Sequence, residues 1–277
     1  MNLIEQSPVN DSNLPYVEFD GHNRVLACLQ HDPVDTGGML HFEAVNDVLP
    51  ETAWLEIDLQ HYDLAIVDQL ASSSCVSQAI TKGSEYVVKQ HTGKTVTLNS
   101  YFLYGIISHG VDRGSKFSEG LAAAQLYGVC EENLLPNRVV YAPYDKVVYD
   151  NAAKFKLSDA LILRTFEQIC TAITRGFVTP LGIYVGQNFS QIDSDGICPL
   201  ATSGVGRHAV LGIGLKKHKR YGWLIKIQNS WGKAFGMNGF SYIHKEFFEQ
   251  SVNAFAMRGL VYNSIDFNTE DDIPVAA

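Results

Sequence analysis

Apolar positions in the first half of the chain recur with a helical period. One face carries apolar or small residues at steps of four, three and four, which predicts a helix that begins near Cys75 and ends before Thr92-Gly93. A second helix is expected from about Ser118 to Tyr127, where Gly128 stops it. The face of the first helix comprises Val76, Ile80, Gly83 and Val87.

In the second half of the chain the period of the apolar positions changes from helical to alternating, after one further helix. A third helix is expected from Phe166 to Ile173, with Thr165 and Gln168 as a capping box and Gly176 at its end. Beyond it, apolar and polar residues alternate, which predicts strands. The expected strands are residues 181–186, 208–214, 223–228 and 239–243.

Helices followed by strands predict an α+β protein with two unlike lobes, and a cleft between such lobes is a natural place for a site. We expect the main domain to span residues 51–265, divided into a helical lobe at about 65–140 and a β lobe at about 141–265. Residues 1–50 have little periodicity and are interpreted as an arm or small cap. Residues 266–277 are interpreted as an acidic tail.

Composition narrows the class of protein. Apolar residues make up 46% of the 277 positions, enough for a full core. The net charge is −9, which disfavours binding to nucleic acid. The one basic run, Lys216 to Arg220, lies between two expected strands and is interpreted as a solvated hairpin tip. No apolar run is long enough to span a bilayer and no secretion signal is visible at the start, so we expect a cytoplasmic protein. Nothing in the pattern calls for a cofactor or a metal.

One of the five cysteines stands apart from the others. The number is odd and no two form a CxxC pair, so neither a disulfide framework nor a zinc site is expected. Cys75 lies at the expected start of the long helix, where free N–H groups and the helix dipole stabilise a thiolate. Cys28, Cys130, Cys170 and Cys198 are interpreted as small buried residues.

A thiolate nucleophile needs an imidazole partner, which can be distant in sequence. His208 begins an expected strand 133 residues after Cys75, and Asn229 follows 21 residues later. An amide at Asn229 could hold the imidazole in the required tautomer, and Trp231 could shield that hydrogen bond from water. Taken singly, each of these residues also fits an ordinary core or turn position.

The order and spacing of these residues resemble those of the papain-like cysteine peptidases over most of residues 52–262. The similarity is strongest to bacterial-type members without a long inhibitory pro-segment. It implies a two-lobed α+β fold, with a helical left lobe, an antiparallel β right lobe and the active-site cleft between them. The matching motifs are Asp58-Leu59-Gln60, Asp68-Gln69 through Cys75, Leu98-Asn99-Ser100, Tyr127 to Glu131, His208-Ala209-Val210, Asn229 to Gly232, and Gly236 with Asn238 to Phe240.

The resemblance also implies roles. Cys75 would be the nucleophile, His208 its base and later acid, and Asn229 the group that orients His208. Gln69 would donate its side-chain amide to the oxyanion hole beside the Cys75 N–H. For peptide binding, it implies Gly114 and Ser115 as the strand that pairs with substrate backbone, Ala209 as a pocket wall beside the scissile bond, and Trp231 at the cleft.

Five positions depart from the family pattern. Leu70 and Ser73 stand where glycines are expected, and Ser115 replaces a second glycine. Val76 follows the cysteine where many members have an aromatic residue, and Arg207 precedes the histidine where small or acidic residues are common. None of these changes removes a catalytic group. We nevertheless expect Ser73 and Ser115 to narrow the cleft.

The leading hypothesis is a cysteine endopeptidase acting on a peptide or protein substrate through a thioester. A second hypothesis is a papain-like scaffold that serves as a structural part of a larger assembly, such as a virion, with the arm or the acidic tail as its contact. An amidase or transglutaminase-like acyl transfer is a third, because fold and triad do not fix the acceptor. The arm lacks helical periodicity, so no inhibitory pro-helix and no obligatory cleavage are expected. An active site of this class would hold a thiolate on Cys75 and a proton on His208.

Overall fold

A computed structural model describes residues 2–3, 14–29, 39–136, 138–140, 143–248, 253–262 and 265–266. The three helices expected from periodicity are present as α1 (Cys75–Thr92), α3 (Phe117–Leu126) and α5 (Phe166–Thr174). Helix α1 ends where the sequence indicates, because Gly93 adopts a φ of 69° and donates its N–H to the Lys89 carbonyl at 2.9 Å.

The capping box of α5 is only half formed as expected. The Thr165 hydroxyl accepts the Gln168 N–H at 3.1 Å. The Gln168 side chain, however, accepts the N–H of Arg164 at 2.6 Å rather than that of Thr165. The return bond is therefore shifted by one residue, and the helix still begins at Phe166.

The four expected strands are also present, and each pairs antiparallel with its neighbours. The sheet continues past them in the order β10-β9-β8-β7-β11-β12, with β4 added to β8 and β6 added to β11. The strands of this sheet are β4 (Ile57–Asp58), β6 (Phe155–Leu163), β7 (Thr179–Val185), β8 (Gly206–His218), β9 (Gly222–Gln228), β10 (Phe240–His244), β11 (Asn253–Tyr262) and β12 (Ile265–Asp266).

Several elements carry no clear period and were not expected. Helix α2 (Ser100–Ser108) has eight of its nine residues buried. A helix that is buried nearly all round is apolar on every face, so its sequence shows no 3.6-residue repeat. A short helix α4 (Lys146–Ala152) and strands β6 and β11 complete this group. The short pairs β1 (Asn2–Leu3) with β5 (Val139–Val140) and β2 (Tyr16–Phe19) with β3 (His22–Val25) lie outside the large sheet.

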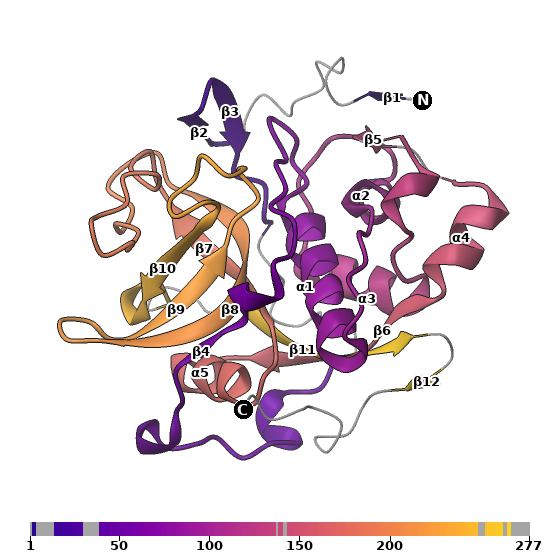
Figure 1. The fold of residues 1–277 in the computed structure, drawn as a ribbon. Helices are drawn as coiled ribbons and strands as arrows, with labels where there is room; N and C mark the ends of the chain where they lie inside the picture. The colour runs from indigo at the N-terminus through magenta and orange to yellow at the C-terminus, as the bar shows by residue number, and fades with distance from the viewer. Residues whose placement is uncertain are drawn as a thin grey trace.

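Two buried clusters correspond to two lobes, which lie on opposite sides of the molecule in Figure 1. Helices α1, α2 and α3 form one, and the sheet with α5 forms the other. Tyr144, Val148 and Phe155, which follow the boundary expected at about residue 141, pack in the helical cluster. Strand β6 divides between the two, with Leu157 in the first and Leu161 in the second.

The N-terminal arm packs on the domain instead of standing apart. Phe42 is fully buried in the cluster of the β lobe, and the Leu49 N–H donates to the Thr171 hydroxyl at 3.1 Å. In Figure 1 the β2–β3 hairpin lies at the upper left of the molecule, above the lobe formed by the large sheet. The acidic tail expected at 266–277 falls almost entirely outside the described residues. Within the described ranges, no helix is both long and apolar enough to cross a membrane.

Candidate active site in a closed groove

The N-terminus of α1 brings Cys75 to the junction of the lobes. Its thiol is completely buried. The backbone N–H groups of Ala209, from β8, and of Ala27, from the arm, point at the sulfur. Cys75 therefore lies beside Ala209, the residue that follows His208.

His208 is also completely buried and uses one ring nitrogen. Its Nε2 forms a 2.7 Å hydrogen bond with Oδ1 of Asn229, which also accepts the Ser230 N–H at 2.8 Å. Trp231 is buried against the imidazole, with ring centroids 4.9 Å apart, and so excludes water from that bond. Nδ1 of His208 has no hydrogen-bond partner among the described residues. The imidazole therefore keeps one nitrogen free to exchange a proton.

Gln69 makes hydrogen bonds with Ser72, which precedes α1, and with Ser230, which follows β9. Its Nε2 donates to the Ser72 carbonyl at 2.8 Å, and its Oε1 accepts the Ser230 hydroxyl at 2.6 Å. The Gln69 N–H donates to the Ser230 carbonyl at 2.8 Å. Because the amide oxygen and one Nε2 hydrogen are held, the second Nε2 hydrogen has a defined direction and is available for an oxyanion.

The groove between the lobes is filled by the protein's own chain. Residues 26–29, here called the closing segment, form parallel backbone bridges with Ser115 on one wall and Arg207 on the other. The Ser115 N–H donates to the Ala27 carbonyl at 3.1 Å, and the Leu29 N–H donates to the Ser115 carbonyl at 2.9 Å. The Cys28 N–H donates to the Arg207 carbonyl at 3.1 Å.

Three glycines make room for this segment. An added Cβ would come within 2.6 Å of the Ala27 carbonyl at Gly114, and within 2.7 Å of Leu26 at Gly206. At Gly182 it would lie 3.2 Å from the Cys28 sulfur. The groove is thus shaped to hold an extended peptide at backbone distance. Gly114 and Ser115, to which the resemblance assigned peptide binding, form one of its walls.

The hairpin before the closing segment is anchored beside Gln69. The fully buried guanidinium of Arg24 pairs with both carboxylate oxygens of Asp68, and Asp68 also accepts the Leu70 N–H at 2.8 Å. Phe19 packs on Trp231 with ring centroids 5.9 Å apart. The arm therefore covers Trp231 and Asp68 as well as Cys75.

Sequence reasoning missed these arm contacts. The absence of helical periodicity argued only against a helical inhibitor, and the groove is occupied by an extended segment. The one available signal was the apolar run Val25 to Leu29, which is typical of a buried strand. That run did not indicate where the strand would pack.

Closure changes the proton affinities at the site. Burial raises the pKa of the Cys75 thiol to about 11 and lowers the pKa of His208 to about 4. Hydrogen bonds from backbone N–H groups to Cys75 and from His208 to Asn229 oppose these shifts but are weaker than the burial effect. The thiolate and imidazolium expected from the sequence are therefore not the favoured forms while the groove is closed.

The positions that depart from the family pattern are accommodated without removing a site group. Leu70 adopts the left-handed φ of 50° that a glycine would take more easily. The Ser73 N–H donates to Asp112 at 2.9 Å, and its hydroxyl is buried without a partner among the described residues. The Arg207 guanidinium lies over the Tyr184 ring, 5.2 Å from its centroid.

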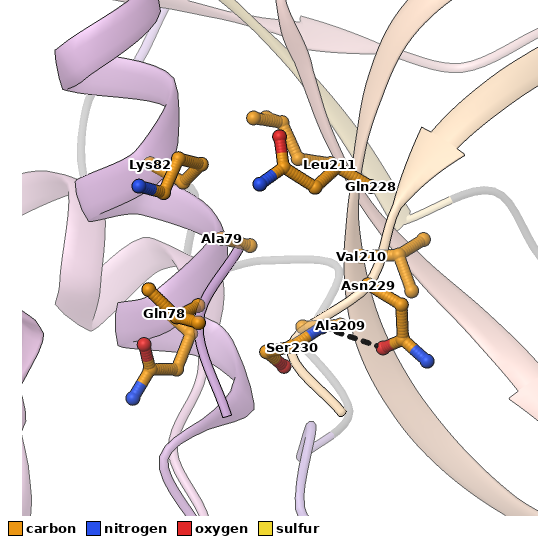
Figure 2. A pocket seen from close by; sticks show the side chains of 10 residues that line it. Gln78, Ala79, Lys82, Ala209, Val210, Leu211, Gln228, Asn229 and Ser230 are labelled. Atoms are coloured by element: carbon orange, nitrogen blue, oxygen red, sulfur yellow. Dashed lines mark hydrogen bonds between the residues drawn. The ribbon is translucent and has the colours of Figure 1, made fainter. Parts of the chain in front are cut away.

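A small cavity lies behind the site, where α1 faces β8 and β9. Figure 2 shows Gln78 and Lys82 on the helix opposite Leu211 and Gln228 on the strands. Its volume of about 10 Å³ is too small for a substrate side chain. Over the part of the chain that is described, no group of three His, Cys, Asp or Glu side chains could hold a metal ion.

Comparison with solved structures places this arrangement in a known fold. No protein-family model and no curated protein matches the chain. Xylellain, a cysteine protease from Xylella fastidiosa, is 18% identical with a TM-score of 0.69, over 84% of this chain and 95% of that one. The digestive procathepsin L 3 of Tenebrio molitor is 16% identical with a TM-score of 0.60, over 78% of this chain and 72% of that one.

Bromelain from Ananas comosus is 15% identical with a TM-score of 0.61, over 78% of this chain and 100% of that one. At such low identity the likeness establishes architecture, and it agrees with the two lobes and the antiparallel sheet described above. The chain has the papain-like fold.

Proposed function

We propose that the protein is a cysteine peptidase whose groove is closed by its own N-terminal segment. The observation that carries the proposal is the arrangement around Cys75. The cysteine lies at a helix N-terminus beside the start of β8, where His208 is held through Nε2 by Asn229 and leaves Nδ1 free. The groove at this point already binds an extended peptide through backbone hydrogen bonds.

In the open groove, water and the helix N-terminus favour transfer of the Cys75 proton to Nδ1 of His208. The thiolate attacks the scissile carbonyl carbon, and the oxygen takes hydrogen bonds from Gln69 Nε2 and the Cys75 N–H. His208 then gives its proton to the leaving amine as the C–N bond breaks. A water molecule, deprotonated by His208, hydrolyses the thioester.

The closing segment cannot itself be cleaved in its bound position. The group that it presents to Cys75 is the N–H of Ala27, whereas attack needs a carbonyl carbon. The segment therefore acts as an inhibitor and not as a substrate. The arm is held by hydrogen bonds, one ion pair and packing, so it can leave the groove without a cut in the chain. We therefore retain the prediction that cleavage of the arm is not obligatory.

The test is turnover of a mixed peptide pool by the full chain and by an Arg24→Ala variant with a weakened arm anchor. We expect cleavage by the variant, and none after adding Cys75→Ala. Cys170→Ala is the matched control, because Cys170 is a buried helix cysteine outside the groove. Turnover that persists without Cys75 refutes the mechanism.

The second candidate function is a structural part of a larger assembly. It is favoured by the closed groove and by the neutral forms of Cys75 and His208 that burial imposes. The two candidates differ in one result. If opening the arm exposes Cys75 to alkylation but no peptide or amide is cleaved, the structural role is the better account.

A further inference from the structure

Three residues on one face of the sheet lie under the closing segment and form what is here called the pocket. Gly182 is the central residue, with Ala209 directly opposite it on β8 and Asn253 directly opposite it on β11. Residues directly opposite one another on neighbouring strands present their side chains to the same face. The pocket floor therefore consists of a methyl group, a position without a side chain, and an amide.

The closing segment fills this pocket with a small side chain. The Cys28 sulfur lies 3.2 Å from the position that a Cβ on Gly182 would occupy, and the Asn253 amide nitrogen lies 3.1 Å from the same point. The thiol and the amide thus meet over Gly182. Phe117 and Phe255, with ring centroids 5.4 Å apart, belong with Cys28 and Ala209 to the same buried cluster.

The side-chain NH₂ group of Asn253 is buried without a hydrogen-bond acceptor among the described residues. The residue is only 7% exposed, and its Nδ2 has no hydrogen-bond partner among the described residues. A buried polar group in this state is costly, and a ligand that supplies a partner relieves the cost. A thiol is a weak partner, and a hydroxyl is a better one.

We infer that Asn253 and Gly182 determine substrate specificity, by selecting a small side chain with a hydrogen-bonding tip at one position on the amino side of the scissile bond. Serine, threonine and cysteine fit this description. Leucine and larger apolar side chains do not, because they would press on Asn253 and leave its amide unpaired. The inference rests on the proposed function, since it names the substrate class of the same groove.

The first experiment uses the closing segment as the ligand and needs no turnover. The rate at which iodoacetamide labels Cys75 in the full chain is measured for Cys28→Ser, Cys28→Ala and Cys28→Leu. We expect Cys28→Ser to label as slowly as the parent chain and Cys28→Ala to label several-fold faster. Cys28→Leu should label at least tenfold faster, because its segment no longer fits.

Each variant is then combined with Asn253→Ala, which removes the amide and makes space. Cys28→Leu should now label about as slowly as the parent, and the advantage of Cys28→Ser over Cys28→Ala should vanish. Cys170 labelling in the same samples reports unfolding, and Asn253→Ser replaces Asn253→Ala where the latter unfolds. The inference is overturned if Cys75 is labelled slowly in the Cys28→Leu single variant. It is also overturned if Asn253→Ala changes the labelling rate of all three Cys28 variants equally.

The second experiment profiles cleavage of a positional peptide library by the Cys28→Leu chain. Serine, threonine and cysteine should be enriched at one position before the scissile bond, and Asn253→Ala should abolish the enrichment. Cleavage without that preference overturns the pocket while leaving the peptidase intact. Absence of cleavage in a chain that labels rapidly refutes the proposed function, and the labelling rates still decide the pocket.

Discussion

The ion pair between Arg24 and Asp68 holds the arm over the site, and its removal should open the groove. The Arg24 guanidinium is completely buried, whereas the Asp68 side chain is 27% exposed. Arg24 also lies over the Phe19 ring, 5.7 Å from its centroid, and donates from Nε to the Phe19 carbonyl at 3.3 Å. Arg24→Ala removes all of these contacts, and Asp68 keeps its bond to Leu70.

Deleting one partner of a fully buried ion pair costs about 3 to 5 kcal/mol. Water can reach Asp68, so we expect a smaller cost of about 2 kcal/mol, which corresponds to a roughly 30-fold larger open population at 1.4 kcal/mol per tenfold change. Because alkylation of Cys75 requires opening, its rate should rise by the same factor.

The assay is carbamidomethylation of the full chain at neutral pH, followed by mass spectrometry of each cysteine-containing peptide. Cys170 lies outside the groove and reports global unfolding. Arg220→Ala is the matched control, since it removes an exposed arginine from the hairpin between β8 and β9. If Cys75 is alkylated in Arg24→Ala at the rate of the parent chain, the ion pair does not hold the groove closed. The same conclusion follows if the alkylation rate of Cys170 rises in parallel with that of Cys75.

Three further outcomes are expected. Denaturant unfolding should show stability falling between about pH 6.5 and 4, because folded His208 stays neutral with its pKa lowered to about 4 while the unfolded chain takes up a proton. The contribution is about 3 kcal/mol at about 1.4 kcal/mol per pKa unit, and His208→Gln should lack it. In a variant with an opened arm, Gln69→Ala should lower kcat about 10²- to 10³-fold, because one oxyanion donor is lost, and an unchanged kcat would exclude that role. Gly128→Ala should destabilise the fold by about 3 kcal/mol, since its Cβ would lie 2.0 Å from the Ala152 carbonyl. Gly93→Ala, where φ is similar and the added Cβ would meet open space, should cost only about 1 kcal/mol. Thermal melts of both variants measure the difference.

The sequence by itself determined the elements whose signals are local. Helix α1 is readable because one face repeats at the helical period and Gly93 can adopt a positive φ to end it. Strands β8 and β9 are readable because their alternation reflects a sheet with two different faces. The order and spacing of Cys75, His208 and Asn229 likewise identified the candidate triad, through their resemblance to one family. Of these three residues, His208 and Asn229 share a hydrogen bond in the structure.

Only the tertiary structure decided what lies in the groove and how the site is charged. Residues 26–29 bond to Ser115 and Arg207, which are 87 and 179 positions from Cys28 along the chain. The local sequence around Cys28 gives no sign of either contact. Such pairing depends on which surfaces the folded lobes bring together, and periodicity carries no record of it. The pKa values of Cys75 and His208 follow from the same cause. Burial by a distant segment outweighs the helix N-terminus that the sequence reveals, so a site predicted to be charged is neutral when the groove is closed.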